Sequence, residues 1–211
     1  MKILLAIINN RPDLNVQFVQ SLLRLIFTTS DAGHEVTPAF YDYYDVSEMR
    51  NIACRQTIEM NMDYVFFMDA DMIYPDDSII KLLQFNVSVI GGMYNTRKLP
   101  TLPVHFRKIK QDRTLNNPEN RDYKFNSNLQ EQEAGGLGGV LVKREVLISM
   151  EDPYFKVEFW EIDGVKGFFG EDIYFFFQLK KLKIKSYVDT DLNYGHVING
   201  AVYADGKLKI I

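Results

Sequence analysis

The sequence has little cysteine, no long apolar run and no excess of positive charge, and each absence excludes a class of protein. Cys54 is the single cysteine among 211 residues, so no disulfide can form within the chain and a cytoplasmic location is expected. Apolar runs such as Ile3–Ile8 are far shorter than the roughly 20 residues that cross a membrane, so no transmembrane segment is expected. The net charge of -4 argues against nucleic-acid binding through a general basic field.

The usual glycine-rich phosphate-binding patterns are also missing. Gly135–Gly139 reads Gly-Gly-Leu-Gly-Gly, which is not the Gly-x-Gly-x-x-Gly pattern, and no Gly-Lys-Ser/Thr of a P-loop occurs. This cluster is either a plain flexible loop or a place where backbone approaches a ligand closely. The isolated arginines Arg50, Arg55 and Arg97 suit either phosphate pairing or ordinary solvent exposure.

What the sequence does contain is a regular alternation of elements over its first 90 residues. The apolar runs predict strands and the helical spacings predict helices, in the order Lys2–Ile8, helix Asp13–Ser30, Glu35–Tyr41, helix Ser47–Met60, Tyr64–Met68, helix Ser78–Phe85 and Val87–Ile90. This order predicts a parallel sheet covered by helices on both faces. Polar residues follow the strand ends, where ligands of such sheets bind.

The second half of the chain begins differently. Gln111–Gln132 is polar and rich in Asn, Asp and Glu, which predicts a long surface loop or mobile lid. Globular patterning resumes at Ala134, with strands expected at Val140–Val142 and Ile184–Val188 and helices at Arg144–Ser149 and Glu171–Lys181.

The main candidate site is Asp69-Ala70-Asp71, directly after an apolar strand. Mg²⁺ and Mn²⁺ prefer oxygen ligands and are often shared between a few carboxylates and a substrate diphosphate. Strand geometry alone would point the two carboxylates to opposite faces, but a chain that turns at a strand end can bring both to one site. The alternative is that both aspartates are turn or cap residues before Pro75.

Two further candidates lie near the C-terminal end. Glu171 and Asp172 open a helix, where the helix dipole alone favours acids. Aromatic residues crowd around them in the sequence, and an acid held among aromatics can have a raised pKa and act as a general base. His196 is either a structural residue or, because Mn²⁺ accepts imidazole beside carboxylates, a third metal ligand.

These segments, in this order, resemble the GT-A class of nucleotide-sugar glycosyltransferases, in particular inverting, family-2-like members with an Asp-x-Asp motif. The resemblance extends over most of residues 1–198 and is carried by Arg50–Ala53, Met68–Asp71, Gly91–Tyr94, Gly138–Val142, Gly170–Asp172 and Asp189–His196. It implies an α/β, Rossmann-like fold with a mixed, mostly parallel central sheet flanked by helices on both faces. The chain also resembles a glycosyltransferase domain of a large chlorella-virus protein, which implies a viral source and further domains.

The resemblance implies one domain over 1–211, with a nucleotide-binding half at 1–100 and an acceptor-binding half at 101–211. It also implies a role for each matching residue. Asp172 is the expected catalytic base, and Asp69, Asp71 and His196 are the expected ligands of Mn²⁺ or Mg²⁺. Asn9, Asn10, Arg11, Arg50, Asn51 and Ala70 are expected to bind the nucleotide. Tyr94, Arg97, Gly138, Gly139, Trp160 and Glu171 are expected to bind the sugar or the acceptor.

The implied activity is metal-dependent, inverting transfer of a sugar from a nucleoside-diphosphate sugar, with uridine as the expected base, to a glycan acceptor hydroxyl. Two alternatives stay open. A sugar-1-phosphate nucleotidyltransferase would use a related sheet, although Asn9–Pro12 lacks the glycines usual after its first strand. A non-catalytic module that binds sugar nucleotides or glycans would need no base.

Overall fold

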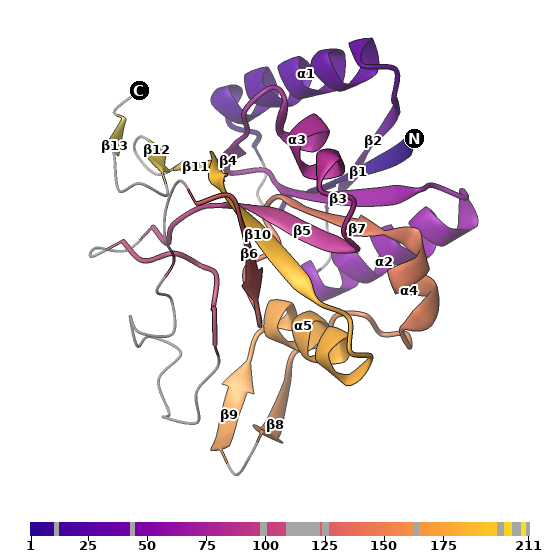
Figure 1. Cartoon of the computed structure of the whole chain (residues 1–211), viewed down its shortest axis with the longest axis vertical. Coiled ribbons are helices and arrows are strands. Elements are labelled where there is room, and N and C mark those ends of the chain that lie inside the picture. Colours follow the sequence, from indigo (N-terminus) through magenta and orange to yellow (C-terminus); the bar gives the residue numbers. More distant parts are fainter. Residues whose placement is uncertain are drawn as a thin grey trace.

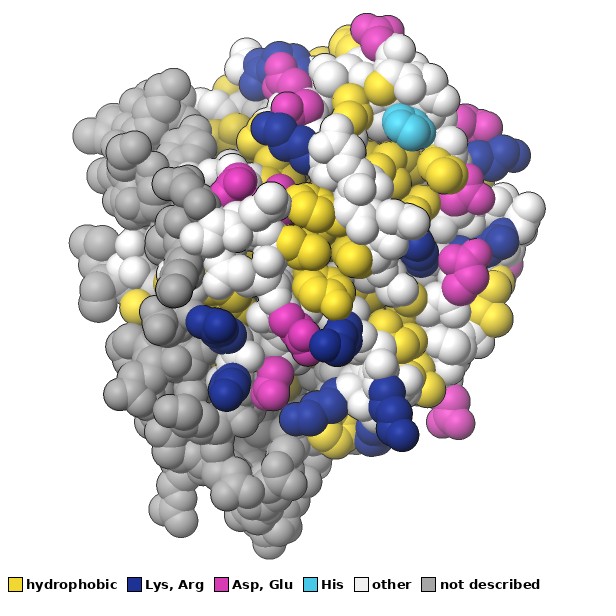
Figure 2. Space-filling model, in the orientation of Figure 1, with side chains coloured by type: hydrophobic (Ala, Val, Ile, Leu, Met, Phe, Trp, Pro, Cys, Tyr) yellow, Lys and Arg dark blue, Asp and Glu magenta, His cyan; other side chains and the backbone are white. Residues whose placement is uncertain are grey.

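The computed structural model describes residues 1–10, 13–42, 45–97, 101–108, 123, 127–162, 165–197, 201–203 and 208–209. Arg11 and most of the predicted polar loop lie outside the described residues. Within the described part of the chain, no helix has both the length and the apolar character needed to span a membrane. On the face shown in Figure 2, acidic and basic side chains lie intermixed.

A seven-stranded sheet of order β2-β1-β3-β7-β5-β10-β6 forms the centre of the molecule (Figure 1). β1 pairs in parallel with β2 and β3, and β5 pairs in parallel with β10. β7 lies antiparallel between β3 and β5, and β6 lies antiparallel beside β10. Five of the seven strands therefore point the same way, which confirms the mixed, mostly parallel sheet. The strands are β1 (Lys2–Ile8), β2 (Glu35–Tyr41), β3 (Tyr64–Asp69), β5 (Val89–Met93), β6 (Leu129–Gln132), β7 (Val140–Lys143) and β10 (Ser186–Asn193).

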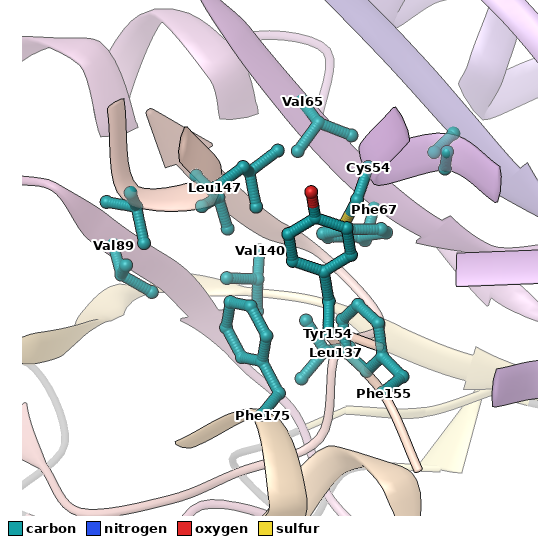
Figure 3. Packing of buried hydrophobic residues seen from close by; sticks show 14 of the residues in the cluster. Cys54, Val65, Phe67, Val89, Leu137, Val140, Leu147, Tyr154, Phe155 and Phe175 are labelled. Carbon is teal, nitrogen blue, oxygen red and sulfur yellow. The ribbon is translucent and has the colours of Figure 1, made fainter. Parts of the chain in front are cut away.

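Helices cover both faces of the sheet, as predicted. Successive residues of β1 point to opposite faces, so Leu5 packs in one core and Leu4 in the other. The first core holds α1 (Val16–Asp31) and α3 (Ser78–Gln84). The second holds α2 (Val46–Glu59), α4 (Arg144–Ser149) and α5 (Glu171–Lys181), and Figure 3 shows Phe175 of α5 and Leu147 of α4 within it.

The start of helix α1 and the end of strand β5 differ from the predicted positions. Helix α1 begins at Val16, three residues later than predicted, because Asn15 caps it by accepting hydrogen bonds from the N–H groups of Gln17 and Phe18. β5 continues through Gly91 and Gly92 to Met93, and only glycine fits at position 92 because a β-carbon there would collide with the ring of Tyr194. Tyr94 follows directly at the sheet edge.

The predicted loop over 111–132 is wrong at its C-terminal end, where Leu129–Gln132 forms the edge strand β6. Gln132 is buried there because its amide donates to the Tyr187 carbonyl and its Oε1 contacts the His105 ring at 2.7 Å. The strands of the first 90 residues that join this sheet, β1, β2, β3 and β5, run in the same direction as predicted, and β7 from the second half of the chain inserts antiparallel between β3 and β5. The burial of Gln132 and the insertion of β7 both depend on partners far away in the sequence.

Two smaller sheets extend the core. A four-stranded sheet of order β13-β12-β11-β4 joins β4 (Met72–Ile73) to β11 (Gly195–Val197), β12 (Ala201–Tyr203) and β13 (Leu208–Lys209). In it, His196 lies opposite Met72, and the Val197 N–H donates to the Asp71 carbonyl at 2.8 Å. A hairpin of β8 (Glu158–Ile162) and β9 (Val165–Phe169) projects beside α5 (Figure 1). The four-stranded sheet thus holds His196 next to the end of β3.

Candidate active site

A cavity of about 550 Å³ lies at the carboxyl ends of β1, β3 and β5. Carboxyl ends of parallel strands meet at one edge of a sheet, so residues distant in sequence converge there. Its walls come from both predicted halves of the chain, since the N-terminus of α5 and strand β11 complete them. The predicted site residues that line it are Asn9, Asn10, Arg50, Asp69, Ala70, Asp71, Tyr94, Arg97, Glu171, Asp172 and His196.

The end of β3 fixes Asp69 at the cavity wall. Its N–H donates to the buried Tyr74 hydroxyl at 3.0 Å, and the next N–H, of Ala70, donates to the Ile8 carbonyl at 3.1 Å. Behind the carboxylate lies Gly138, where a β-carbon would come within 2.7 Å of Asp69 Oδ2. Gly138 therefore leaves the space that the Asp69 side chain needs.

Arg50 forms the inner of two ionic clusters in the cavity. Its side chain is 3% exposed, and its Nη1 donates to Glu171 Oε1 at 2.8 Å and to Asp172 Oδ1. Its Nη2 donates to Asp69 Oδ1 at 3.2 Å. Burial alone would lower the pKa of Arg50, but Asp172, Asp69 and Glu171 together raise it, so the guanidinium stays charged. One buried cation on α2 thus joins carboxylates from β3 and α5.

Asp172 has the electrostatics of a general base. Removal of the carboxyl from solvent raises its pKa to about 7, and Glu171 and Asp69 add to this shift, while Arg50 opposes it. A base works best when its pKa lies near the working pH, because it is then both free of its proton and able to take another. The Asp172 side chain as a whole remains 29% exposed and lines the cavity, so a molecule bound there can reach it.

Asp71, Arg97 and His196 form the outer cluster. Arg97 Nη2 pairs with Asp71 Oδ2, and Arg97 Nε donates to His196 Nε2 at 2.7 Å. The other ring nitrogen, Nδ1, lies 2.9 Å from the Asn95 carbonyl. A carbonyl oxygen only accepts and the arginine Nε only donates, so the proton sits on Nδ1 and the lone pair of Nε2 faces the cavity.

The outer cluster fits a divalent cation better than the full predicted ligand set does. Asp71 Oδ1 and His196 Nε2 lie 3.9 Å apart, and the Nδ1–H bond to a carbonyl is the usual support of a metal-binding histidine. Asp69 instead points to Arg50, and within the described ranges no three His, Cys, Asp or Glu side chains converge. Mg²⁺ is often bound by one or two protein ligands and completes its shell with phosphate and water, so a carboxylate and an imidazole such as Asp71 and His196 are chemically compatible with such a site.

Three predicted site residues whose side chains or backbone the structure describes, Asn51, Gly138 and Gly139, do not line the cavity. Asn51 is buried, and both of its amide atoms bond to the Phe155 backbone at 2.9 Å, so its side chain joins α2 to the segment before β8. Gly138 supports Asp69, while Gly139 has a φ of +113° and packs against Tyr194. Trp160 pairs with Gly167 in the β8–β9 hairpin, and its side chain lies outside the described residues.

Sequence reasoning missed several residues that shape the cavity. Gly135 and Gly136 line it, and a β-carbon on Gly136 would collide with the Tyr94 hydroxyl, which accepts the Gly138 N–H at 3.1 Å. The glycine cluster was the available signal for this close approach. Phe155 packs beneath Arg50, with 5.8 Å between the guanidinium carbon and the ring centre, and no sequence pattern pairs these two residues.

Comparison with known proteins places the fold. The sequence matches no protein-family model and no curated protein. Among solved structures, A197 from STIV is 22% identical with a TM-score of 0.64, over 100% of this chain and 94% of that one. The catalytic domain of Drosophila β1,4-galactosyltransferase 7, solved with xylobiose, is 14% identical with a TM-score of 0.50, over 94% of this chain and 72% of that one. A mutant of the same enzyme with manganese, UDP-Gal and xylobiose gives the same values. The chain therefore has a Rossmann-like fold of the GT-A type.

Proposed function

We propose that this chain is an inverting glycosyltransferase that moves a sugar from a nucleoside-diphosphate sugar to a hydroxyl of a glycan acceptor, with Mn²⁺ or Mg²⁺ bound. The observation that carries the proposal is one cavity that holds the Asp71–His196 pair beside Asp172, whose pKa is raised to about 7. The likeness in fold to a galactosyltransferase solved with manganese, UDP-Gal and xylobiose supports these classes of ligand, with uridine as the base.

The charges in the cavity support a metal requirement. Among the described residues, four carboxylates and two guanidiniums line it, namely Asp69, Asp71, Glu171, Asp172, Arg50 and Arg97, and these six carry a net charge of two negatives when all are ionised. Such a cavity repels a diphosphate, because like charges at close range interact strongly where water is partly excluded. One divalent cation offsets the excess and allows a diphosphate to enter.

The residues then have separate tasks in a single displacement. Asp71 and His196 would hold the metal, which when bound neutralises the diphosphate and stabilises its charge as it leaves. Asp172 takes the proton of the acceptor hydroxyl, and the acceptor oxygen bonds to the anomeric carbon on the face opposite the diphosphate. The bond from that carbon to the diphosphate oxygen breaks, so the configuration inverts without an enzyme nucleophile.

Calorimetry of donor binding tests the proposal. UDP and UDP-galactose are titrated into metal-free protein and again into protein with Mn²⁺. We expect binding only with Mn²⁺, and loss of that binding in Asp71→Ala. Asp76→Ala is the matched control, since Asp76 pairs with Arg24 at 3.0 Å on the surface and does not line the cavity. Equal affinity with and without Mn²⁺ contradicts the metal requirement. If UDP and UDP-galactose bind in neither condition, the same titrations are made with the other nucleoside diphosphates, and absence of binding to all of them contradicts the glycosyltransferase proposal itself.

The alternative function is a non-catalytic module that binds sugar nucleotides or glycans. The role of Asp172 distinguishes this module from an enzyme. A binding module has no use for a base, so its behaviour would not depend on the Asp172 proton acceptor. The position of Asp172, in the same cavity as the Asp71–His196 pair, favours the enzyme.

A further inference from the structure

We propose that Arg97 is a built-in counter-ion of the Asp71–His196 pair: it occupies the cation position in the free protein and moves to the donor diphosphate when a divalent metal binds. The inference rests on the proposed function, because it assigns a metal to that pair and a diphosphate to the same cavity. It replaces the expected role of Arg97 in sugar or acceptor binding with a role in metal and phosphate binding.

The contacts of Arg97 use the same atoms that a metal would need. Its Nε donates to the lone pair of His196 Nε2 at 2.7 Å, and its Nη2 pairs with Asp71 Oδ2. A planar guanidinium presents its N–H donors in a fixed fork, so it makes both contacts at once through different nitrogens. Since one lone pair serves one partner, the metal and Arg97 compete directly for His196.

The exposure of Arg97 suits it to leave. Its side chain is 34% exposed, whereas those of Asp71 and His196 are 16% and 14% exposed. Its backbone is held close by, since Asn95 bridges to Pro103 and the Thr96 N–H donates to the Leu102 carbonyl at 2.8 Å. The long side chain therefore turns on its own rotatable bonds while the main chain stays in place.

Electrostatics give the displaced side chain a direction. A divalent cation held by Asp71 and His196 repels the nearby guanidinium of Arg97, because like charges at close range repel strongly where water is partly excluded. Arg97 also lines the cavity that Asn9, Asn10 and Asp172 share, so it remains next to the proposed donor site after it moves. Guanidinium groups bind phosphate oxygens through paired hydrogen bonds, so the diphosphate is the partner that replaces Asp71.

Metal titration without nucleotide tests the competition, and its readout is metal affinity rather than activity. Mn²⁺ is titrated into the wild-type protein, Arg97→Met and the control Arg55→Met. Arg55 is 37% exposed and pairs with Glu48 at 2.7 Å and Asp152 at 3.6 Å, so its loss removes one cation of similar exposure that does not line the cavity. We expect Arg97→Met to bind Mn²⁺ about tenfold more tightly, because a charged hydrogen-bond competitor is gone. Arg55→Met should match the wild type.

The same variants are then titrated with UDP at saturating Mn²⁺. Arg97→Met should bind UDP about tenfold more weakly, because the phosphate contact is lost. Unchanged or weaker Mn²⁺ affinity in Arg97→Met overturns the competition, and unchanged or tighter UDP affinity overturns the move to the diphosphate. If the wild type binds UDP only with Mn²⁺, but Arg97→Met does not show both tighter Mn²⁺ binding and weaker UDP binding, the inference fails while the proposed function stands. If the wild type binds neither Mn²⁺ nor UDP, the proposed function fails first.

Discussion

Arg50 and Arg97, the two arginines that line the cavity within the described part of the chain, hold its carboxylates in different ways. Arg50 is 3% exposed, sits on a helix packed into the core and contacts carboxylates from β3 and α5. Arg97 is 34% exposed, follows a strand end and contacts one carboxylate and one imidazole. A buried cation without partners is strongly unfavourable, whereas an exposed one is compensated by water. Arg50 is therefore suited to a fixed contact and Arg97 to an exchangeable one.

This difference separates two requirements of the proposed reaction. The base must be oriented before the acceptor arrives, and Arg50 orients Asp172 in the free protein. The metal and the donor must enter and leave at every turnover, so the contacts on that side must break readily. The inner cluster thus belongs to the scaffold, and the outer cluster changes partners.

The largest expected effect is on transfer, when the base of the inner cluster is neutralised. Asp172→Asn keeps the size of the side chain but removes the proton acceptor, so the turnover number should fall by about 10²–10⁴-fold. UDP affinity with Mn²⁺ should stay within about twofold of the wild type, because Asp172 is assigned no donor contact. Release of UDP from the donor in the presence of acceptor measures the first quantity, and calorimetry measures the second. Wild-type turnover in this variant removes Asp172 as the base.

The next effect is on stability, when the buried cation is removed. Arg50→Met leaves Asp69, Glu171 and Asp172 without their shared cation, so the free energy of unfolding should fall by about 3–5 kcal/mol. Urea denaturation monitored by circular dichroism measures the change. Arg50→Lys keeps the positive charge, so its free energy of unfolding should fall by less than that of Arg50→Met. If the free energy of unfolding of Arg50→Met falls by less than about 1 kcal/mol, the Arg50 contacts contribute no more than ordinary surface ion pairs, which contradicts the prediction.

A pH effect of intermediate size follows from the inner cluster. Burial raises the pKa of Asp172 to about 7, so the carboxyl is protonated below that pH and ionised above it. A base acts only when ionised, so the turnover number should fall about tenfold per pH unit below 7 and level off above it. Initial rates between pH 5 and about 9, with bound donor and Mn²⁺ held saturating, give the profile. A rate that stays constant down to pH 5 contradicts the assignment.

The smallest effect is on the stability of the outer cluster. Arg97→Met should change the free energy of unfolding by less than about 1 kcal/mol, because the ion pair is partly exposed and screened by solvent. The same urea experiment that measures Arg50→Met gives this value. If the two variants lose equal stability, the contrast between a fixed and an exchangeable arginine is wrong.

The fold was predictable where apolar periodicity is strong. Lys2–Ile8 is apolar after its first residue and forms β1, and Glu171–Lys181 forms α5 with the predicted bounds. Leu129–Gln132 was not predictable as a strand, because the polar Gln132 is buried only through its partners His105 and Tyr187, far away in the sequence. The antiparallel insertion of β7 also depends on pairing between distant segments, which local patterns do not encode.

The candidate site was predictable in its location and less so in its contacts. The rule that ligands bind beyond strand ends correctly places Asn9, Asp69 and Asp71 at one edge. Two of the partners of Arg50, Glu171 and Asp172, lie 121 and 122 residues further along the chain, so no local pattern reveals them. Asn51 is adjacent to Arg50 in sequence yet bonds to the Phe155 backbone instead of lining the cavity. Helix geometry turns these two neighbours in different directions.

A crystal structure of the protein with Mn²⁺ and UDP, with the manganese located by its anomalous scattering, tests the central claim most directly. The account predicts one manganese bonded to Asp71, His196 Nε2 and the diphosphate, with Arg97 turned from His196 to a phosphate oxygen and Arg50 still bound to Asp172. Manganese or UDP bound outside this cavity, or Arg97 still on His196 with both ligands present, would contradict it.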